Sequence, residues 1–409
     1  MSAAPVASAP SARRPARRRR RLDATLIVGI ALVGVIVIGA ILVATVGRNF
    51  FSPGNIRDIL TGMSVLGFVA IGQTFVILGA SLDLSVPYVV SLSSLIAADL
   101  MRGNPANIPV AVLAALGVAA LIGLANGLIV TKLHVNGFIA TLGVGLIIKG
   151  YLDTNYKGTS GNVPWDFQLI GATGLGPVPV STLIMFGVAL LAALFLARTR
   201  TGHHLYAVGG NEQVARFSGI RTARPLIIAH MLCSITAAFA GLLLASRLGV
   251  GSPTVGTQGG YDLLSIAAVV LGGTLLMGGR GSIWGTIGGV AIFAVVDNVM
   301  SVMQVNPFLK DVVRGVVIVA AVAVYTSRRL DRRRPRFGVG APAAALPAPA
   351  ALPEPVEGRL PEPVEGRLPE LVEGSRAAST SSATEPGSAT EPGPATGVGA
   401  ATDSKGGAR

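Results

Sequence analysis

Residues 24–46 read ATLIVGIALVGVIVIGAILVATV, a run without a charged residue. An α-helix needs about 20 predominantly apolar residues to cross the ~30 Å hydrocarbon core of a membrane. Further runs of this kind, separated by polar breaks, continue to Val324. Hydrophobic residues make up 51% of the chain and charged residues 13%, whereas a typical soluble domain has about 25% charged residues. The sequence therefore predicts an integral membrane protein rather than a large soluble helical protein.

Hydropathy predicts an all-α polytopic membrane protein with about ten transmembrane helices. The third and fifth are short for a full crossing, so we expect them to be tilted, broken or re-entrant. Glycine is abundant inside the spans, as is typical where transmembrane helices pack closely. The predicted spans are 24–46, 59–80, 86–101, 108–131, 137–152, 181–197, 226–248, 262–279, 283–303 and 308–326.

The net charge of +13 is unevenly distributed along the chain. Basic clusters at 13–21, 198–224 and 328–336 each lie beside an apolar run. Lys and Arg are enriched in cytoplasmic loops, and the predicted outer loops 153–180 and 249–261 hold only one basic residue between them. The charges therefore predict that both termini are cytoplasmic. We expect the basic N-terminus to contact anionic lipid rather than nucleic acid.

These boundaries divide the chain into three regions. Residues 1–23 form a basic cytoplasmic segment, 24–326 a transmembrane domain, and 327–409 a basic stop region followed by a tail. The tail carries the units LPEPVEGR, LPEPVEGR and LPELVEGS from Leu352, and then ATEPG twice. Its Pro, Gly, Ser, Thr and Glu residues leave little to bury, so we predict that the tail is disordered.

The loop at 199–225, TRTGHHLYAVGGNEQVARFSGIRTARP, is the most informative polar segment. Gly209–Gly210 permits a tight turn, and Asn211 is a favoured N-cap. Glu212 follows in the first turn, where the positive end of the helix dipole favours an acid. Gly219 then ends this short helix in a left-handed conformation. With one apolar face, the helix is either an ordinary connection or a docking element for a cytoplasmic partner.

This loop resembles the coupling helix of ATP-binding-cassette importer permeases of the ribose/monosaccharide type, whose loops carry GGNxxAARxSGI-like sequences. Further stretches resemble the same family in the same order. They are AIGQTFVILGASLDLSVPYVVSLS from Ala70, ANGLIVTKLHVNGFIATLGVGLIIKG from Ala125, and GGYDLLSIAAVVLGGTLLMGGRGSIWGTIGGV from Gly259. The similarity covers about residues 25–326.

The chain departs from the family pattern at two places. It reads ASLDLSVP at 80–87, where the family usually has GGIDLSVG. It reads VNGFIATLG at 135–143, where the family often has VPPFIATLG. These differences leave the family resemblance intact, but substrate specificity does not transfer with it.

The resemblance implies a permease subunit in the bacterial cytoplasmic membrane that imports a monosaccharide of the ribose, xylose or galactose kind, or a related polar solute, by alternating access. It also implies a second permease copy, a pair of cytoplasmic ATPase subunits that bind ATP and Mg, and an external sugar-binding protein. The sequence holds no G-x-x-x-x-G-K-[ST] phosphate loop, so we expect no cofactor and no enzymatic activity in this chain. The residues that the resemblance assigns to ATPase coupling are Gly209, Gly210, Asn211, Glu212, Ala215, Arg216 and Gly219.

Polar side chains inside the spans are the candidates for the solute path, because polarity is costly in lipid and usually faces the protein interior. Amides, hydroxyls and carboxylates suit the hydroxyl groups of a neutral sugar, and an aromatic ring can stack against it. The candidate residues are Gln73, Asp83, Ser85, Asn126, Asn136, Phe138, Thr141, Asp297 and Asn298.

Several candidates also have a structural interpretation. Asp83 and Ser85 would cap the third helix at a break, and Asn126 would form a helix–helix hydrogen bond. The pair Asp297–Asn298 either lines the path or binds a neighbouring subunit, with equal support. Phe138 either stacks against a sugar ring or packs in the protein, which is more common for an aromatic side chain.

We predict no catalytic or metal site. His203 and His204 are adjacent, so they do not share a helix face, and no carboxylate or Cys cluster accompanies them. His134 and His230 are interpreted as interfacial residues and Cys233 as a small core residue. An ion-gradient-driven secondary transporter is the alternative function, and the scarcity of intramembrane acids disfavours it.

Overall fold

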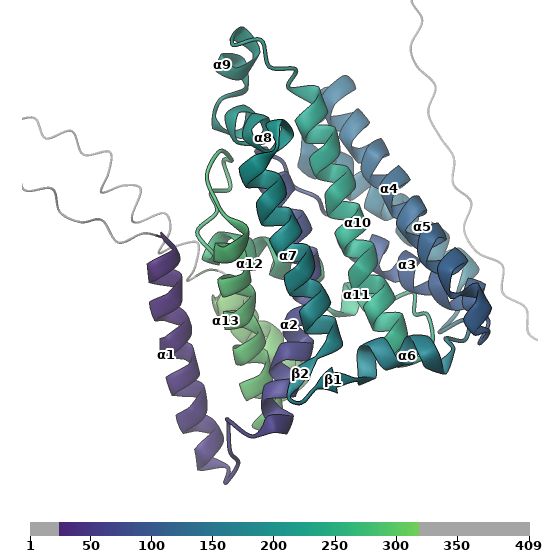
Figure 1. The fold of residues 1–409 in the computed structure, drawn as a ribbon, viewed down its shortest axis with the longest axis vertical. Coiled ribbons are helices and arrows are strands. Elements are labelled where there is room, and N and C mark those ends of the chain that lie inside the picture. Colours follow the sequence, from purple (N-terminus) through teal and green to yellow (C-terminus); the bar gives the residue numbers. More distant parts are fainter. Residues whose placement is uncertain (1–23, 318, 320–409) are drawn as a thin grey trace, which may run out of the picture. The chain divides into compact units, whose positions relative to one another are not determined.

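The computed structural model describes residues 24–317 and 319 (Figure 1). Contacts divide the chain into residues 1–337 and 338–409, and every described residue lies in the first unit. The predicted basic segment at the N-terminus, the predicted tail and the last part of the predicted tenth span lie outside the described residues. The part of that span that is described, 307–317, is helical.

Helices account for nearly all the regular structure of the described residues. The α-helices are α1 Ala24–Thr45, α2 Pro53–Leu78, α3 Val86–Met101, α4 Ile108–Lys132, α5 Gly137–Asn155, α6 Trp165–Ala172, α7 Val180–Arg198, α8 Arg200–Gly210, α9 Glu212–Phe217, α10 Ala223–Leu248, α11 Val255–Gln258, α12 Tyr261–Leu271 and α13 Ile283–Val302. A 3-10 turn at Pro105–Asn107 precedes α4, and β1 Gly174–Leu175 pairs antiparallel with β2 Val178–Pro179.

Seven of these helices are long and apolar enough to cross a membrane: α1, α2, α4 with its preceding turn, α5, α7, α10 and α13. The helices α3 and α12 are apolar but shorter, with 16 and 11 residues. The all-α membrane architecture is therefore confirmed. The count of ten spans stays a prediction.

The predicted C-terminal end of the span 262–279 is wrong, because α12 ends at Leu271. The residues that follow read GGTLLMGGRG and form a loop, the 272–281 loop. In this loop Gly273, Gly278 and Gly279 adopt φ angles of 91°, 80° and 70°. These left-handed conformations suit glycine and end the helix.

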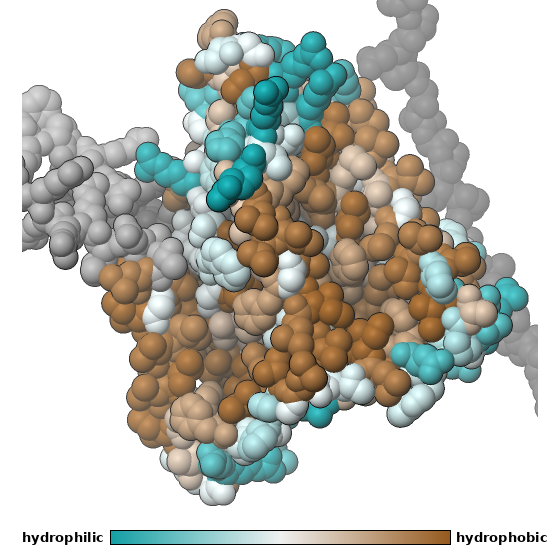
Figure 2. All heavy atoms as spheres, viewed as in Figure 1, coloured by the Kyte–Doolittle hydropathy of each residue, from teal (hydrophilic) through white to brown (hydrophobic). Residues whose placement is uncertain are grey.

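Helices α2, α10 and α13 are the most buried of the long helices. In α2 78% of the apolar stretch is buried and in each of α10 and α13 67%, against 17% in α1 and 22% in α4. Helix α10 packs against α2, α3 and α4. The outer helices instead expose Leu, Ile and Val side chains, which Figure 2 shows as a hydrophobic surface between hydrophilic ends. This distribution fits a bundle surrounded by lipid.

Small residues allow α4 and α10 to approach closely. A Cβ atom at Gly123 of α4 would lie 2.5 Å from the carbonyl oxygen of His230, on α10. One turn further along α4, a Cβ atom at Gly127 would lie 2.7 Å from the Cα atom of Ile227. Glycines four residues apart are a familiar packing device between transmembrane helices. Because of this contact, α10 lies against α4 along its first two turns.

Residues 79–85 form a non-helical connection between α2 and α3, named here the α2–α3 break. Because α3 has 16 residues, it is about 24 Å long and shorter than the ~30 Å hydrocarbon core. The break lies against α5, since Leu84 N–H donates at 2.9 Å to Thr141 Oγ1, one turn into that helix. Irregular backbone is tolerated at such a depth where protein surrounds it, and the polar side chains of the break are buried.

The end of α2 forms a Schellman motif. Ser81 N–H donates to the carbonyl of Val76 at 3.1 Å, and Ala80 N–H donates to the carbonyl of Ile77 at 2.9 Å. This motif needs a left-handed residue, usually glycine, and Ala80 takes that place with a φ of 60°. Ala80 therefore places a Cβ atom where the backbone conformation disfavours one.

We predict that Ala80→Gly stabilises the protein by about 0.5–1 kcal/mol, because glycine adopts the left-handed conformation without the steric cost of a Cβ atom. The measurement is the midpoint of thermal unfolding of the detergent-solubilised protein. The control is Ala114→Gly, the same chemical change inside α4, which should destabilise by roughly the same amount. An Ala80→Gly midpoint at or below that of the unmodified protein would show that Ala80 carries no such strain.

Candidate functional site

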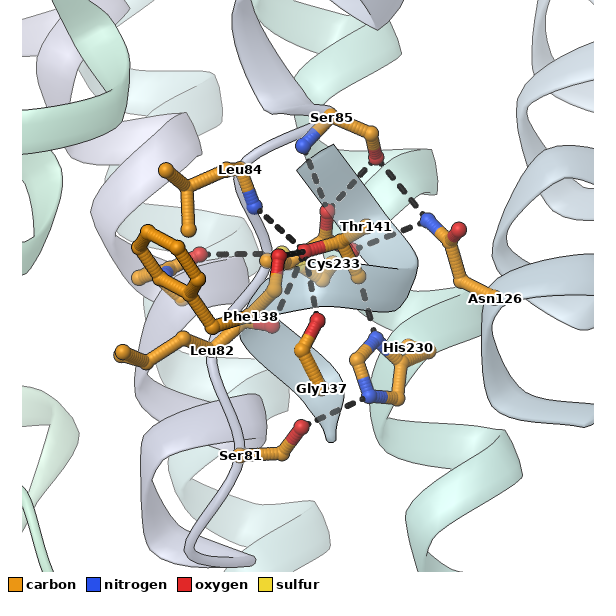
Figure 3. Close-up of polar contacts among 12 residues, drawn as sticks. Ser81, Leu82, Leu84, Ser85, Asn126, Gly137, Phe138, Thr141, His230 and Cys233 are labelled. Carbon is orange, nitrogen blue, oxygen red and sulfur yellow. Dashed lines mark hydrogen bonds and ion pairs between the residues drawn. The ribbon is translucent and has the colours of Figure 1, made fainter. Parts of the chain in front are cut away.

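The carboxylate of Asp83 holds together a buried polar cluster on the α2–α3 break. Its Oδ1 atom accepts hydrogen bonds from Ser85 N–H at 3.0 Å and from Ser85 Oγ–H at 2.6 Å. Its Oδ2 atom lies 3.3 Å from His230 Nδ1 and 3.5 Å from Asn126 Nδ2. Asn126 also donates to Ser85 Oγ at 2.9 Å. Figure 3 shows Ser85, Asn126 and His230 converging from the break, α4 and α10.

The cluster bears on two structural interpretations from the sequence. The capping role expected of Ser85 is wrong, because Ser85 occupies the N-cap position of α3 but makes no capping bond with its own side chain. Asp83 does accept the Ser85 N–H, so its carboxylate satisfies a backbone donor at the start of the helix. Asn126 forms the expected hydrogen bond between helices. Whether these residues also contact a solute stays a prediction.

The interpretation of His230 as an interfacial residue is wrong. Its side chain is fully buried, because α10 is enclosed by α2, α3 and α4 at this level. Its Nε2 atom lies 3.2 Å from Ser81 Oγ, and its Nδ1 atom lies near Asp83 Oδ2. Both ring nitrogens therefore face polar groups of the break. The signal available in the sequence was the position of an ionisable residue inside an apolar run, which usually marks an interior site.

Thr141 is also brought to the break, whereas the side chains of Asn136 and Phe138 are not. The buried Thr141 hydroxyl donates to the Gly137 carbonyl at 2.8 Å and accepts from Leu84 N–H. Asn136 is exposed and acts as the N-cap of α5, where its side chain accepts from Phe138 N–H at 2.9 Å. The Phe138 side chain is 45% exposed. Asn136 and Phe138 thus lie at the accessible start of α5.

Gln73 lies on α2, beside Cys233 of α10. Its Oε1 atom accepts a weak bond from Cys233 Sγ at 3.5 Å, while its Nε2 atom has no hydrogen-bond partner within the described part of the chain. The Oδ1 atom of Asn126 likewise has no partner there. Buried polar atoms without a partner are costly, so these two amides are groups that could still accept or donate a hydrogen bond.

Asp297 and Asn298 belong to a different part of the bundle. Asp297, on α13, accepts two hydrogen bonds from Arg314, at 3.0 and 3.1 Å, and so joins α13 to the helix at 307–317. Asn298 has a buried Oδ1 atom that finds no partner among the described residues. Neither residue contacts the cluster around Asp83. Their place on a solute path or at a subunit contact stays a prediction.

The polar loop at 199–225 contains two helices, α8 and α9, at the end of the bundle shown at the top of Figure 1. The predicted tight turn at Gly209–Gly210 is wrong, because both glycines form the last turn of α8. Asn211 is the N-cap of α9, as predicted, and accepts from Val214 N–H at 3.0 Å. Gly219 has a φ of 79°, as predicted for the end of the helix.

Helix α9 presents a mixed surface. Glu212 and Arg216 are exposed, whereas Ala215 is buried. The apolar side chains of Phe217 and Val214 are 89% and 59% exposed. Exposed apolar groups rimmed by charges are typical of surfaces that bind another protein.

Helix α8 ties this segment to the end of α2. A Cβ atom at Gly209 would lie 1.8 Å from the Leu78 carbonyl oxygen, so only glycine fits this contact. Gly279, in the 272–281 loop, donates its N–H to the same carbonyl at 3.0 Å. Tyr206 of α8 donates its hydroxyl to the carbonyl of Gly281 at 3.0 Å. The exposed α9 is thus connected through α8 to the residue that precedes the α2–α3 break.

We predict that Asp83→Ala destabilises the protein by about 3 kcal/mol, because it leaves the buried donors of Ser85 and the ring of His230 without their partner. Asp83→Asn keeps one acceptor oxygen and should cost about 1 kcal/mol. Denaturant or thermal unfolding in detergent gives both values.

The control for these variants is Asp153→Ala. Asp153 pairs with Lys149 on the exposed end of α5, and exposed ion pairs contribute about 0–1 kcal/mol. Equal losses of stability at positions 83 and 153 would contradict a special role for the buried carboxylate.

Comparison with known proteins places this bundle among permeases. Residues 55–322 match the family described as "Branched-chain amino acid transport system / permease component". The ribose import permease protein of Escherichia coli (strain K12) is 40% identical over 287 residues, which are 69% of this chain and 88% of that protein. The ribose import permease protein of Bacillus subtilis (strain 168) is 36% identical over 297 residues, 71% of this chain and 89% of that protein.

A more distant relative is the galactose/methyl galactoside import permease protein of Haemophilus influenzae (strain ATCC 51907 / DSM 11121 / KW20 / Rd). It is 32% identical over 294 residues, 67% of this chain and 87% of that protein. No solved structure matches the chain. The matched residues include the α2–α3 break, the α8–α9 segment and α10. The chain therefore belongs to the branched-chain amino acid transport system / permease component family, as a sugar permease of the ribose/monosaccharide type of ATP-binding-cassette transporters.

Proposed function

We propose that this chain is the membrane subunit of an ATP-driven, binding-protein-dependent importer that moves a monosaccharide across the bacterial cytoplasmic membrane by alternating access. Its relatives are named as transport permeases for ribose, for galactose and methyl galactoside, and for D-allose. These solutes are neutral and rich in hydroxyl groups. A neutral sugar of this class is therefore the proposed solute.

One observation carries the proposal: an exposed helix is mechanically connected to buried irregular backbone. Helix α9 exposes Phe217 and Val214, and α8 packs closely against the end of α2 at Gly209. A partner that pushes α9 would therefore move the end of α2 and the break beside it. A partner shifts such an equilibrium only through different affinities for the two states. Binding and release of ATP on a separate ATPase subunit would supply that difference.

The charge distribution supports the orientation. The α8–α9 segment carries the basic cluster at 198–224. Because Lys and Arg are enriched in cytoplasmic loops, this segment is expected on the cytoplasmic side. With ten spans, counting α3, α12 and the helix that begins at 307, both termini lie inside. The ATPase would then bind at α9, and the sugar-binding protein would dock at the opposite end, where α6 lies.

The polar groups divide into two roles in this proposal. The buried side chains of Asp83, Ser85 and Thr141 already bond to one another or to backbone, so they shape the path, whereas Asn126 Oδ1 and Gln73 Nε2 are without partners among the described residues and could bond to a solute. The exposed start of α5, with Asn136 and Phe138, and a second copy of the permease would supply further contacts. Hydroxyl groups of a sugar match amides and an aromatic face.

An ion-driven secondary transporter is the second candidate. The buried Asp83–His230 pair favours it, because ionisable residues inside a membrane often form proton or ion relays. Asp83 is, however, the only buried acid among the described residues. A single ionisable pair cannot pass a proton or an ion along the described part of the bundle. We therefore rank this function below the ATP-driven importer.

The test of the proposed function is reconstitution of the full chain in vesicles with its ATPase and binding protein. D-ribose, D-galactose and D-allose are supplied in turn, and uptake and ATP hydrolysis are measured together. We expect at least one of these sugars to stimulate hydrolysis and to accumulate only with ATP present. Uptake that follows an imposed proton or sodium gradient without ATP would support the secondary transporter instead.

We predict that Glu212→Arg abolishes copurification of the ATPase and sugar-stimulated hydrolysis, while the thermal midpoint of the permease is unchanged. Glu212 is exposed in the first turn of α9, so a charge reversal alters the docking surface and the dipole contact but no core packing. Asp166→Arg is the matched control for ATPase copurification alone, because Asp166 is an exposed acid in the first turn of α6, at the end of the bundle away from α9. Native ATPase binding by Glu212→Arg would remove α9 from the docking surface.

A further inference from the structure

His230 joins α10 to two points of the α2–α3 break. Its Nε2 atom lies 3.2 Å from Ser81 Oγ and its Nδ1 atom lies 3.3 Å from Asp83 Oδ2. The three side chains are 9% exposed or less. In such surroundings a hydrogen bond that is lost is not replaced by water, so these two contacts hold the break against α10.

Helix α10 leads directly from the α9 segment to this contact. The chain passes from Gly219 through a short connection to Ala223, where α10 begins. His230 lies about two turns further along the same helix. A helix moves as a unit over such a short length, so a displacement of α9 that shifts the start of α10 also shifts the ring of His230.

Gly137 leaves the space that the Ser81 side chain occupies. A Cβ atom at Gly137 would lie 2.0 Å from Ser81 Oγ. Any larger residue at 137 must therefore displace the Ser81 hydroxyl from its position beside His230. The Ser81 hydroxyl and the space left open at Gly137 are thus the two sides of one contact.

We propose that His230 is a positioning residue that transmits movement of α10 to the α2–α3 break, and that Ser81 and Gly137 form a matched pair that keeps the Ser81 hydroxyl on the His230 ring. The role in transmission rests on the proposed function, because it needs a transport cycle to act in. The matched pair rests on the geometry alone.

The first test measures transmission as the number of sugar molecules taken up per ATP hydrolysed, in the reconstituted complex and with a sugar that the unmodified chain imports. Ser81→Ala and His230→Ala should each lower this ratio about two- to tenfold, the factor that corresponds to one lost hydrogen bond. If His230→Ala does not fold, Ser81→Ala still decides, since it removes only a hydroxyl.

The control is Ser234→Ala, the same change one turn further along α10, at a buried hydroxyl without a partner among the described residues. Its ratio should be native. A merely structural role of His230 would lower the amount of folded complex without changing the ratio per ATP. Native ratios for both Ser81→Ala and His230→Ala would overturn the transmission role.

The second test is a double-mutant cycle between positions 81 and 137, measured as thermal midpoints in detergent. Gly137→Ala should lower the midpoint in the unmodified chain, because the new methyl group displaces the Ser81 hydroxyl. In the Ser81→Gly background the same change should leave the midpoint unchanged or raise it, since the nearest remaining atom, Leu82 N, lies 3.4 Å away. Gly143→Ala is the control on α5, where a Cβ atom meets nothing within 4 Å.

The outcomes separate the two proposals. Equal effects of Gly137→Ala in both backgrounds would overturn the matched pair, whatever the chain transports. A complex of the unmodified chain that imports none of the tested sugars would refute the proposed function and, with it, the transmission role. Sugar import with native ratios in the variants would leave the proposed function in place and refute only the transmission role.

Discussion

Backbone N–H and C=O groups inside a membrane must be satisfied within the protein, and the α2–α3 break meets this demand without a helix. The Schellman bonds of Ser81 and Ala80 satisfy carbonyls at the end of α2. Further along, Asp83 accepts the N–H of Ser85, and Thr141 accepts the N–H of Leu84. Side chains thus replace the hydrogen bonds that a continuous helix would make. The polar residues that suit a solute path are therefore also the ones that allow the break to exist.

The break in turn needs neighbours close enough to reach it. Gly123 and Gly127 bring α4 to the backbone of α10, which places Asn126 and His230 beside Asp83. Larger residues at these glycines would separate the helices by more than a hydrogen bond can span, given that a Cβ atom would already lie 2.5–2.7 Å from the α10 backbone. The polar cluster therefore depends on close packing by small residues. Glycine in the spans allows α4 and α10 to bring Asn126 and His230 to Asp83.

Much of the fold could be predicted from the sequence, because apolar length and helix-ending residues are local signals. The bounds of α3, α4, α7 and α13 follow the predicted spans to within about two residues, well inside the expected uncertainty. The end of α12 was missed because a loop rich in Leu and Gly has the hydropathy of a span. The burial of His230 and its contact with Ser81 could not be predicted, since they depend on which helices pack together and at what register. Asn136 and Thr141 illustrate the same limit, because they lie in one motif yet only Thr141 reaches the break.

The two connections from α9 to the break differ in physical kind. The contact through α8 is between backbone atoms of Gly209 and Leu78, which are too close to approach each other further. A movement of α8 toward α2 would therefore displace the end of α2. The contact through α10 is a pair of hydrogen bonds at His230. Hydrogen bonds are directional, and each contributes about 1 kcal/mol to stability. A push on α9 would therefore reach the break by both routes, through the backbone contact at Gly209 and through the hydrogen bonds of His230. Two states of the break that differ in these bonds would be separated by a few kcal/mol, a gap that differential binding of a partner can reverse.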